Sequence, residues 1–237
     1  YSDDLLHPWG PMNDSLALSQ PLARSLRTYL VIWAGQVISV FGSSLTSFAL
    51  GVWVYERTGL ATQFALMGFF SSLPALVFAP VAGALVDRWD RRLAMILSDG
   101  GAALVTVVLI ALLLGGDLQL GYLYVAMVAA SLFGSFQWPA YSAVTTLLVS
   151  RDQLGRVNGL DQFGQAASQL LAPMAAASLL AAVGLAGVMT VDLATFLIAL
   201  ASLLWVRVPR PPRQVSANGT GGEEPPFRDQ VRMGWRF

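Results

Sequence analysis

The protein has 237 residues, of which 55% are hydrophobic and 12% are charged, and its mean hydropathy is +0.60. Soluble domains carry about a quarter charged residues, so this composition predicts a membrane protein. All of the basic residues are arginines and there is no cysteine. This excludes disulfides, thiolate metal sites and a cysteine nucleophile. No pattern indicates a resident cofactor, a metal site or nucleic-acid binding.

Six stretches are apolar and long enough to cross a bilayer, which takes about 20 residues as a helix. The uncharged run over residues 162–191 is too long for one crossing, and residues 183–187, which include Gly184 and Gly187, are the expected break. The predicted spans lie between residues 27 and 56, within 58–86, at 93–114, within 118–150, at about 157–182 and at about 188–206. The sequence therefore predicts an all-α membrane protein with a six-helix bundle over residues 27–206.

The flanking segments differ in composition from the bundle. Residues 1–26 form a polar tail, and residues 207–226 are rich in proline and glycine, as in a flexible linker. In residues 227–237, Phe227, Val231 and Trp235 recur every four residues beside three arginines, which predicts the start of a basic amphipathic helix. The sequence stops inside this pattern. We expect a truncation there; a frayed tail is the alternative.

The arginines predict the orientation. If the six spans alternate, only Arg57 falls on one side of the membrane. The arginines of the other side are Arg24, Arg27, Arg88, Arg91, Arg92, Arg151, Arg156, Arg207, Arg210, Arg213, Arg228, Arg232 and Arg236. The positive-inside rule places this larger group, and both termini, in the cytoplasm.

The second connection carries a recognisable motif, Gly83-Ala-Leu-Val-Asp87-Arg88-Trp-Asp90-Arg91-Arg92. It resembles the signature loop G-x-L-x-D-R-x-G-R-R of the major facilitator superfamily, except that Asp90 stands where the family usually has glycine. We expect Asp90 to cap the third helix. The resemblance implies the amino-terminal half of a twelve-span carrier, built as two inverted three-helix repeats. It also implies that Gly83, Asp87, Arg88, Arg91 and Arg92 act as a conformational latch against the missing half. A solvated loop that obeys the positive-inside rule is the alternative.

The fifth span has small residues at the spacing of an antiporter motif found in drug exporters, with Gly159 and Pro173 as its identical positions. Ordinary small-residue packing with a proline kink explains this pattern equally well. Trp138-Pro139-Ala140, Asn158 and Val191-Asp192 resemble the bacterial branch of macrolide-efflux and enterobactin-exporter proteins. That resemblance implies a bacterial inner-membrane protein that exports small molecules, with proton antiport as an expectation from the family alone.

Polar side chains inside the membrane are costly and usually face protein or water. In the resembling fold, the first and fourth helices and parts of the second and fifth line the substrate path. Gln36, Gln137, Gln162 and Gln165 are the candidates for that path, with interhelical hydrogen bonding as the alternative. Asp161 is a candidate gate or proton carrier, or simply a first-turn helix charge. Asp99 and Asp192 are expected to be structural, because they fall on the peripheral helices.

Three functions remain open. The first is a secondary exporter of hydrophobic or amphipathic molecules that works by alternating access, with the lipid bilayer, a small-molecule substrate and a carboxy-terminal six-helix half as partners. The second is the membrane half of an ATP-driven exporter, although a sequence without lysine cannot hold the phosphate-binding G-x4-G-K-[ST] loop. The third is an inactive or scaffold-like fragment. No arrangement of residues predicts an enzyme.

Overall fold

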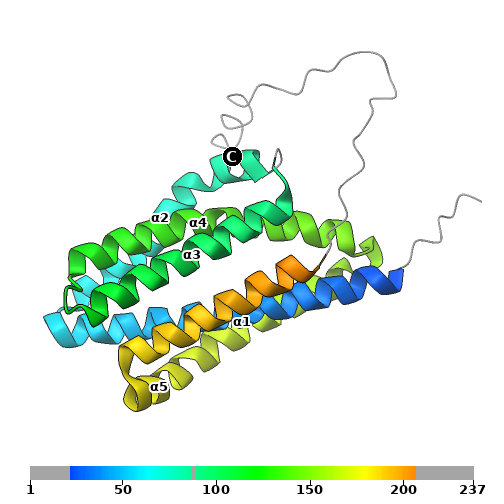
Figure 1. Cartoon of the computed structure of the whole chain (residues 1–237). Helices are drawn as coiled ribbons and strands as arrows, with labels where there is room; N and C mark the ends of the chain where they lie inside the picture. The colour runs from blue at the N-terminus through cyan, green and yellow to red at the C-terminus, as the bar shows by residue number, and fades with distance from the viewer. Residues whose placement is uncertain (1–21, 87–88, 207–237) are drawn as a thin grey trace, which may run out of the picture.

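The computed structural model describes residues 22–86 and 89–206, and these residues form an all-helical bundle (Figure 1). Its elements are α1 (Leu22–Thr58), α2 (Ala61–Val86), α3 (Arg91–Leu114), α4 (Leu120–Leu148), the short 3-10 helix η2 (Arg151–Gln153) and α5 (Leu154–Trp205). The five α-helices are each long and apolar enough to cross a membrane. The helix α1 begins at Leu22, inside the segment predicted as a polar tail. The rest of that tail, the linker and the amphipathic segment lie outside the described residues.

Local chemistry explains where several helices begin and end. Gly59 and Gly116 have φ values of 65° and 79°, and they end α1 and α3 in the left-handed conformation that glycine adopts without steric cost. The Asp90 side chain accepts a hydrogen bond of 3.0 Å from the Arg92 backbone N–H and so caps the start of α3. The expected role of Asp90 is therefore confirmed. Asp90, which replaces the usual glycine of the motif, thus serves as the N-cap of α3.

The helix α5 contains one break. Gly184 has φ 68° and ψ −179°, which no α-helical residue adopts, and it lies inside the predicted break at residues 183–187. Figure 1 shows the ribbon turning back on itself near the α5 label, where its yellow becomes orange. We call residues 154–183 the first arm of α5 and residues 185–205 the second arm. Each arm is long enough to cross a hydrocarbon core of about 30 Å.

Two apolar clusters mark the two ends of the bundle. The arginine-end cluster consists of buried residues from the parts of the helices that lie near arginines in the sequence. Its members include Tyr29, Ile32, Val86, Ala94, Met95, Tyr141, Val144, Leu148, Val157 and Leu203. The far-end cluster includes Leu50, Val54, Met67, Leu109, Leu123, Ala176, Leu185 and Met189. Within the described residues Arg27, Arg91, Arg92, Arg151 and Arg156 therefore belong to one end. Arg57 belongs to the other end and lies over the Trp53 ring, 5.0 Å from its centroid.

Close packing of α1 on the second arm of α5 depends on two glycines. A Cβ atom at Gly42 would overlap the Thr195 hydroxyl and lie 2.9 Å from Asp192 Oδ1. One at Gly35 would lie 3.0 Å from Ser202 Cβ. Small residues allow such approaches in lipid, where packing and hydrogen bonds hold helices together. Gly42 lets α1 approach Asp192, the carboxylate of the second arm, and Gly35 lets it approach Ser202.

We predict that Gly42→Ala destabilises the bundle by about 1–3 kcal/mol, because the added methyl group overpacks the contact with Thr195 and Asp192. Gly68→Ala in α2 is the matched control, since no described atom lies within 4 Å of a Cβ there. That control should be neutral or stabilising by up to about 1 kcal/mol. Unfolding of both variants in detergent, followed by circular dichroism, measures the difference. Equal stability would contradict the packing described here.

Candidate functional site

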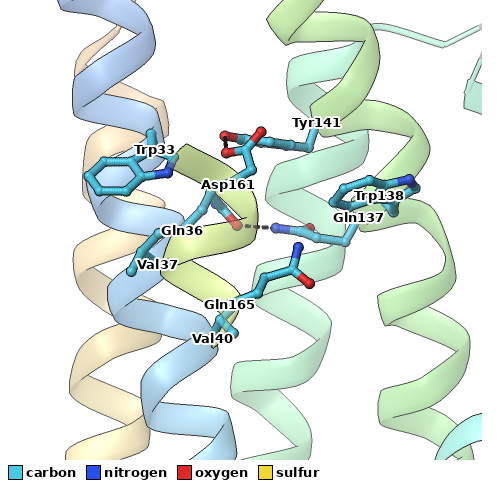
Figure 2. Close-up of a pocket in the computed structure, with 10 residues that line it drawn as sticks. Trp33, Gln36, Val37, Val40, Gln137, Trp138, Tyr141, Asp161 and Gln165 are labelled. Carbon is cyan, nitrogen blue, oxygen red and sulfur yellow. Dashed lines mark hydrogen bonds between the residues drawn. The ribbon is translucent and has the colours of Figure 1, made fainter. Parts of the chain in front are cut away.

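A pocket opens between α1, the first arm of α5 and α4, and we call it the glutamine pocket (Figure 2). Its volume is about 80 Å³. The lining residues are Trp33, Gln36, Val37 and Val40 of α1, Gln137, Trp138 and Tyr141 of α4, and Asp161, Gly164 and Gln165 of α5. Three of the four predicted path glutamines therefore meet in one place, together with the predicted gate Asp161. The walls combine two indole rings with amide groups, a surface suited to amphipathic molecules.

Two tyrosines hold the Asp161 carboxylate. Tyr29 and Tyr141 donate hydrogen bonds to Asp161 Oδ1 at 2.9 Å and 2.7 Å. The tyrosine hydroxyls are themselves 3.3 Å apart. In Figure 2 the Asp161 carboxylate and the Tyr141 hydroxyl lie together at one end of the pocket. This end adjoins the arginine-end cluster, to which both tyrosines belong. Asp161 is thus anchored to α1 and α4 rather than being a free charge of its own first turn.

A second carboxylate, Asp99 of α3, is buried behind the glutamine pocket. Gln36 Nε2 donates to Asp99 Oδ2 at 2.9 Å, and Gln137 Nε2 donates to Asp99 Oδ1 at 3.0 Å. Gln137 Nε2 also donates to Gln36 Oε1, the bond drawn as a dashed line in Figure 2. Asp99 is only 4% exposed. One hydrogen-bonded group therefore links α1, α3 and α4 in the middle of the bundle.

A larger cavity lies on the other side of these glutamines, and we call it the carboxylate cavity. Its volume is about 610 Å³, and Asp99, Asp192, Gln36 and Gln137 are among its lining residues. Hydroxyl groups supply much of its polar lining, namely those of Ser39, Ser43, Ser44, Thr46, Ser47, Ser71, Ser98, Thr106 and Ser131. The Ser43 hydroxyl lies 3.4 Å from Asp192 Oδ1 and donates a hydrogen bond to it. Gln36, Val40 and Gln137 line both spaces and form the wall that they share.

The described part of the predicted latch is tied to its own half of the bundle. Arg92 Nε and Nη2 donate to the backbone oxygens of Leu203 and Leu204, each at 2.8 Å. These carbonyls belong to the last turn of α5, where helix carbonyls lack partners and cations are favoured. Arg91 Nη1 donates to Ala143 O of α4 at 3.3 Å. Asp87 and Arg88 lie outside the described residues.

Other predicted site residues lie differently from the expected arrangement. Gln162 is exposed and lines neither the glutamine pocket nor the carboxylate cavity. A Cβ atom added at Gly159 or Gly83 would have no described atom within 4 Å, so neither glycine makes a close helix contact among the described residues. Pro173 lies within α5 and lines the carboxylate cavity, whereas the non-helical residue of α5 is Gly184.

Some site residues were missed from the sequence. Asp99 was expected to be structural on a peripheral helix; it is bonded to its neighbours, but those neighbours are the two pocket glutamines. Tyr29 and Tyr141 were not predicted as site residues at all. A tyrosine hydroxyl inside an apolar helix needs a partner, and this requirement was the one available signal. Sequence spacing alone does not show which carboxylate supplies that partner.

Comparison with known proteins agrees with these features. The Major Facilitator Superfamily model matches residues 32–237. The chain is 32% identical over 182 residues to macrolide efflux protein A of Streptococcus pyogenes, covering 77% of this chain and 45% of that protein. It is 33% identical over 153 residues to macrolide efflux protein A of Enterococcus faecalis, covering 65% and 46%. An uncharacterized MFS-type transporter of Bacillus subtilis, YfiS, is 26% identical over 192 residues.

The chain spans about half the length of the curated relatives it matches. Its helices are long and apolar enough for a multi-pass membrane protein. The family match covers most of the sequence, and the relatives at 32% and 33% identity are efflux proteins of bacteria. The chain therefore belongs to the Major Facilitator Superfamily.

Proposed function

We propose that the chain is the amino-terminal half of a secondary transporter that exports hydrophobic or amphipathic small molecules by alternating access. The observation that carries this proposal is the glutamine pocket, which gathers Gln36, Gln137, Gln165 and Asp161 between α1, α4 and α5. Two indole rings in the same pocket add apolar surface for a ligand. In this proposal the pocket is one wall of a substrate path, and a second six-helix half supplies the opposite wall.

The proposed topology has six crossings, with the two arms of α5 as the fifth and sixth. The first three crossings and the last three would then form the two inverted repeats of the fold. The arginine end faces the cytoplasm of a bacterial cell, and so do both termini. The common end of Arg27, Arg91, Arg92, Arg151 and Arg156 supports this orientation, because alternating crossings bring these residues to one side.

The proposed latch divides into two parts. Arg92 and Arg91 already bond backbone carbonyls of α5 and α4, so they hold this half together at the cytoplasmic end. Gly83 has open space beside its Cα among the described residues, which leaves room there for the other half. Asp87 and Arg88 complete the motif, and we assign them contact with that half. Opening toward the cytoplasm would separate this second group of contacts and leave the first intact.

The substrate class is proposed from the pocket walls and from the relatives. Amide groups and indole rings bind ligands that combine apolar surface with a few polar groups. The relatives from Streptococcus pyogenes and Enterococcus faecalis are named for macrolide efflux. Macrolides are therefore the first compounds to test. Asp161, held by two tyrosines at the end of the pocket, is the proposed gate.

An ATP-driven half-exporter is the less favoured function. At the proposed cytoplasmic end, α3 begins five residues after α2 ends, and η2 begins three residues after α4 ends. Long cytoplasmic helix extensions for coupling to an ATPase are not seen among the described residues. An inactive fragment is the expected behaviour of the 237 residues alone, since half a carrier has only one wall of its path.

We predict that cells expressing only these 237 residues accumulate a radiolabelled macrolide as control cells do. Cells expressing the chain together with the reading frame that follows Phe237 should accumulate less, and a protonophore should abolish that difference. Energy-dependent efflux by the chain alone would contradict the half-carrier proposal. The proposal would also be contradicted if efflux stopped when ATP was depleted at a constant proton gradient.

Gln165→Leu should weaken macrolide binding by the two-half protein roughly tenfold, the effect of losing about one hydrogen bond in the pocket. Gln162→Leu is the matched control, because Gln162 is exposed three residues earlier on the same arm and lines neither space. Equilibrium binding to protein in nanodiscs compares the two variants. If Gln162→Leu lowers affinity as much as Gln165→Leu, the glutamine pocket is not the binding surface.

A further inference from the structure

We propose that Asp99 is a proton-binding site and that Gln36 and Gln137 transmit its protonation to the glutamine pocket. The inference rests on the proposed transport function, to which it adds the place where a proton acts. The geometry behind it is direct: both glutamines touch the Asp99 carboxylate, and both line the pocket proposed to hold substrate. Asp99 itself does not line that pocket but faces the carboxylate cavity.

The hydrogen bonds of this group are incomplete when Asp99 is ionised. The Asp99 oxygens accept one amide N–H each, and Gln36 Oε1 accepts another from Gln137. Gln137 Oε1 is buried and has no donor among the described residues. A buried acceptor without a donor is unfavourable. One added proton on Asp99 would supply a donor to Gln137 Oε1, in exchange for the bond that Gln36 Oε1 now accepts from Gln137.

Polar groups continue through the same cavity. The Thr46 side chain lies beside Asp192, in a residue only 7% exposed. The cavity therefore contains two carboxylates and several hydroxyl groups. A water or proton path to Asp99 through this space has polar groups to support it.

The charges around Asp99 leave it without a cationic partner in the described structure. From α5, Asp192 faces the same cavity, and Asp161 lies beyond the two glutamines with Tyr29 and Tyr141. From α1, α2 and α4 the facing polar groups are glutamines, serines and threonines. No arginine is among the described residues that line either space. A buried charge is costly unless it is paired, and a bound proton removes that charge.

The orientation of the amides favours a proton over a metal cation. Nitrogen atoms of both glutamines point at the carboxylate, whereas Na⁺ or Ca²⁺ would require oxygen ligands in those places. A proton requires only that one amide turn over. A hydronium ion that reaches Asp99 through the cavity transfers a proton to Asp99 Oδ1: one hydronium O–H bond breaks, the carboxyl O–H bond forms, and neutral water is released. The hydrogen bond from Gln137 Nε2 to that oxygen is lost. The Gln137 amide then rotates by half a turn, and its Oε1 accepts from the new O–H.

Rotation of Gln137 changes the surface of the glutamine pocket. Its Nε2 moves to the former position of Oε1, and Gln36 Oε1 loses its donor. Both amides line the pocket, so their preferred ligand groups change with the protonation of Asp99. Proton and substrate are then coupled through side chains in contact, without an acid among the residues that α1 and α4 contribute to the pocket.

Infrared difference spectroscopy of the purified protein in nanodiscs, recorded as pH is lowered, tests the proposal without any substrate. We expect the C=O band of a protonated carboxyl group to appear together with a shift in the amide C=O band of a glutamine, the latter identified by heavy-carbon labelling of glutamine. Asp99→Asn should abolish both changes. Gln137→Met should abolish the glutamine shift and keep the carboxyl band.

Asp192→Asn is the matched control, because Asp192 lines the same cavity but bonds Ser43 instead of the pocket amides. It should leave the coupled bands of Asp99 unchanged. If wild-type protein shows no carboxyl band assignable to Asp99 while it keeps its helical circular dichroism, the proposal fails. It also fails if the glutamine shift persists in Asp99→Asn, or if Na⁺ moves these bands at constant pH. None of these results depends on efflux, so they leave the transport proposal to its own test.

Discussion

The bundle is organised around a carboxylate that three helices share. Asp99 lies on α3 between two apolar clusters, and its charge is accommodated by amide groups from α1 and α4. The hydrocarbon core of a bilayer offers such a group no hydrogen bonds, so the protein must supply them. The partners of Asp99 therefore fix how these helices pack. The same amides then form the wall between the glutamine pocket and the carboxylate cavity. One structural requirement, the satisfaction of a buried charge, thus places the polar surface of the candidate substrate path.

The two ends of the bundle are held by different means. At the arginine end Arg92 satisfies the last carbonyls of α5, and the Tyr29 and Tyr141 hydroxyls meet on Asp161. At the far end the described contacts are mainly apolar, apart from Arg57 over Trp53 and the Tyr124 hydroxyl, which donates to Gln63 of α2. The buried carboxylate Asp161 and the bonds of Arg91 and Arg92 to backbone oxygens lie on the side that carries the family motif.

Much of the fold could be predicted from the sequence, because bilayer thickness limits helix length and the arginines alternate with the spans. The breaks between helices near residues 59, 116 and 184 each contain a glycine with positive φ. Gln36, Gln137, Gln165 and Asp161 were also identified, since polar groups in apolar helices are conspicuous. Gln162 is exposed and does not line the pocket, so its place in the substrate path stays a prediction. The link from Asp99 to the pocket could not be predicted, since it depends on the packing of three helices whose rotation the sequence leaves undetermined.

The central claim is that the protein crosses the membrane six times with its arginine end in the cytoplasm. The absence of cysteine makes this directly measurable. Single cysteines at the exposed positions Gln119, Ala182 and Asp152 are labelled with a membrane-impermeant maleimide in intact cells. The account predicts labelling at Gln119→Cys and Ala182→Cys without permeabilisation, and labelling at Asp152→Cys only after it. Labelling of Asp152→Cys in intact cells, or protection of Ala182→Cys there, would contradict it.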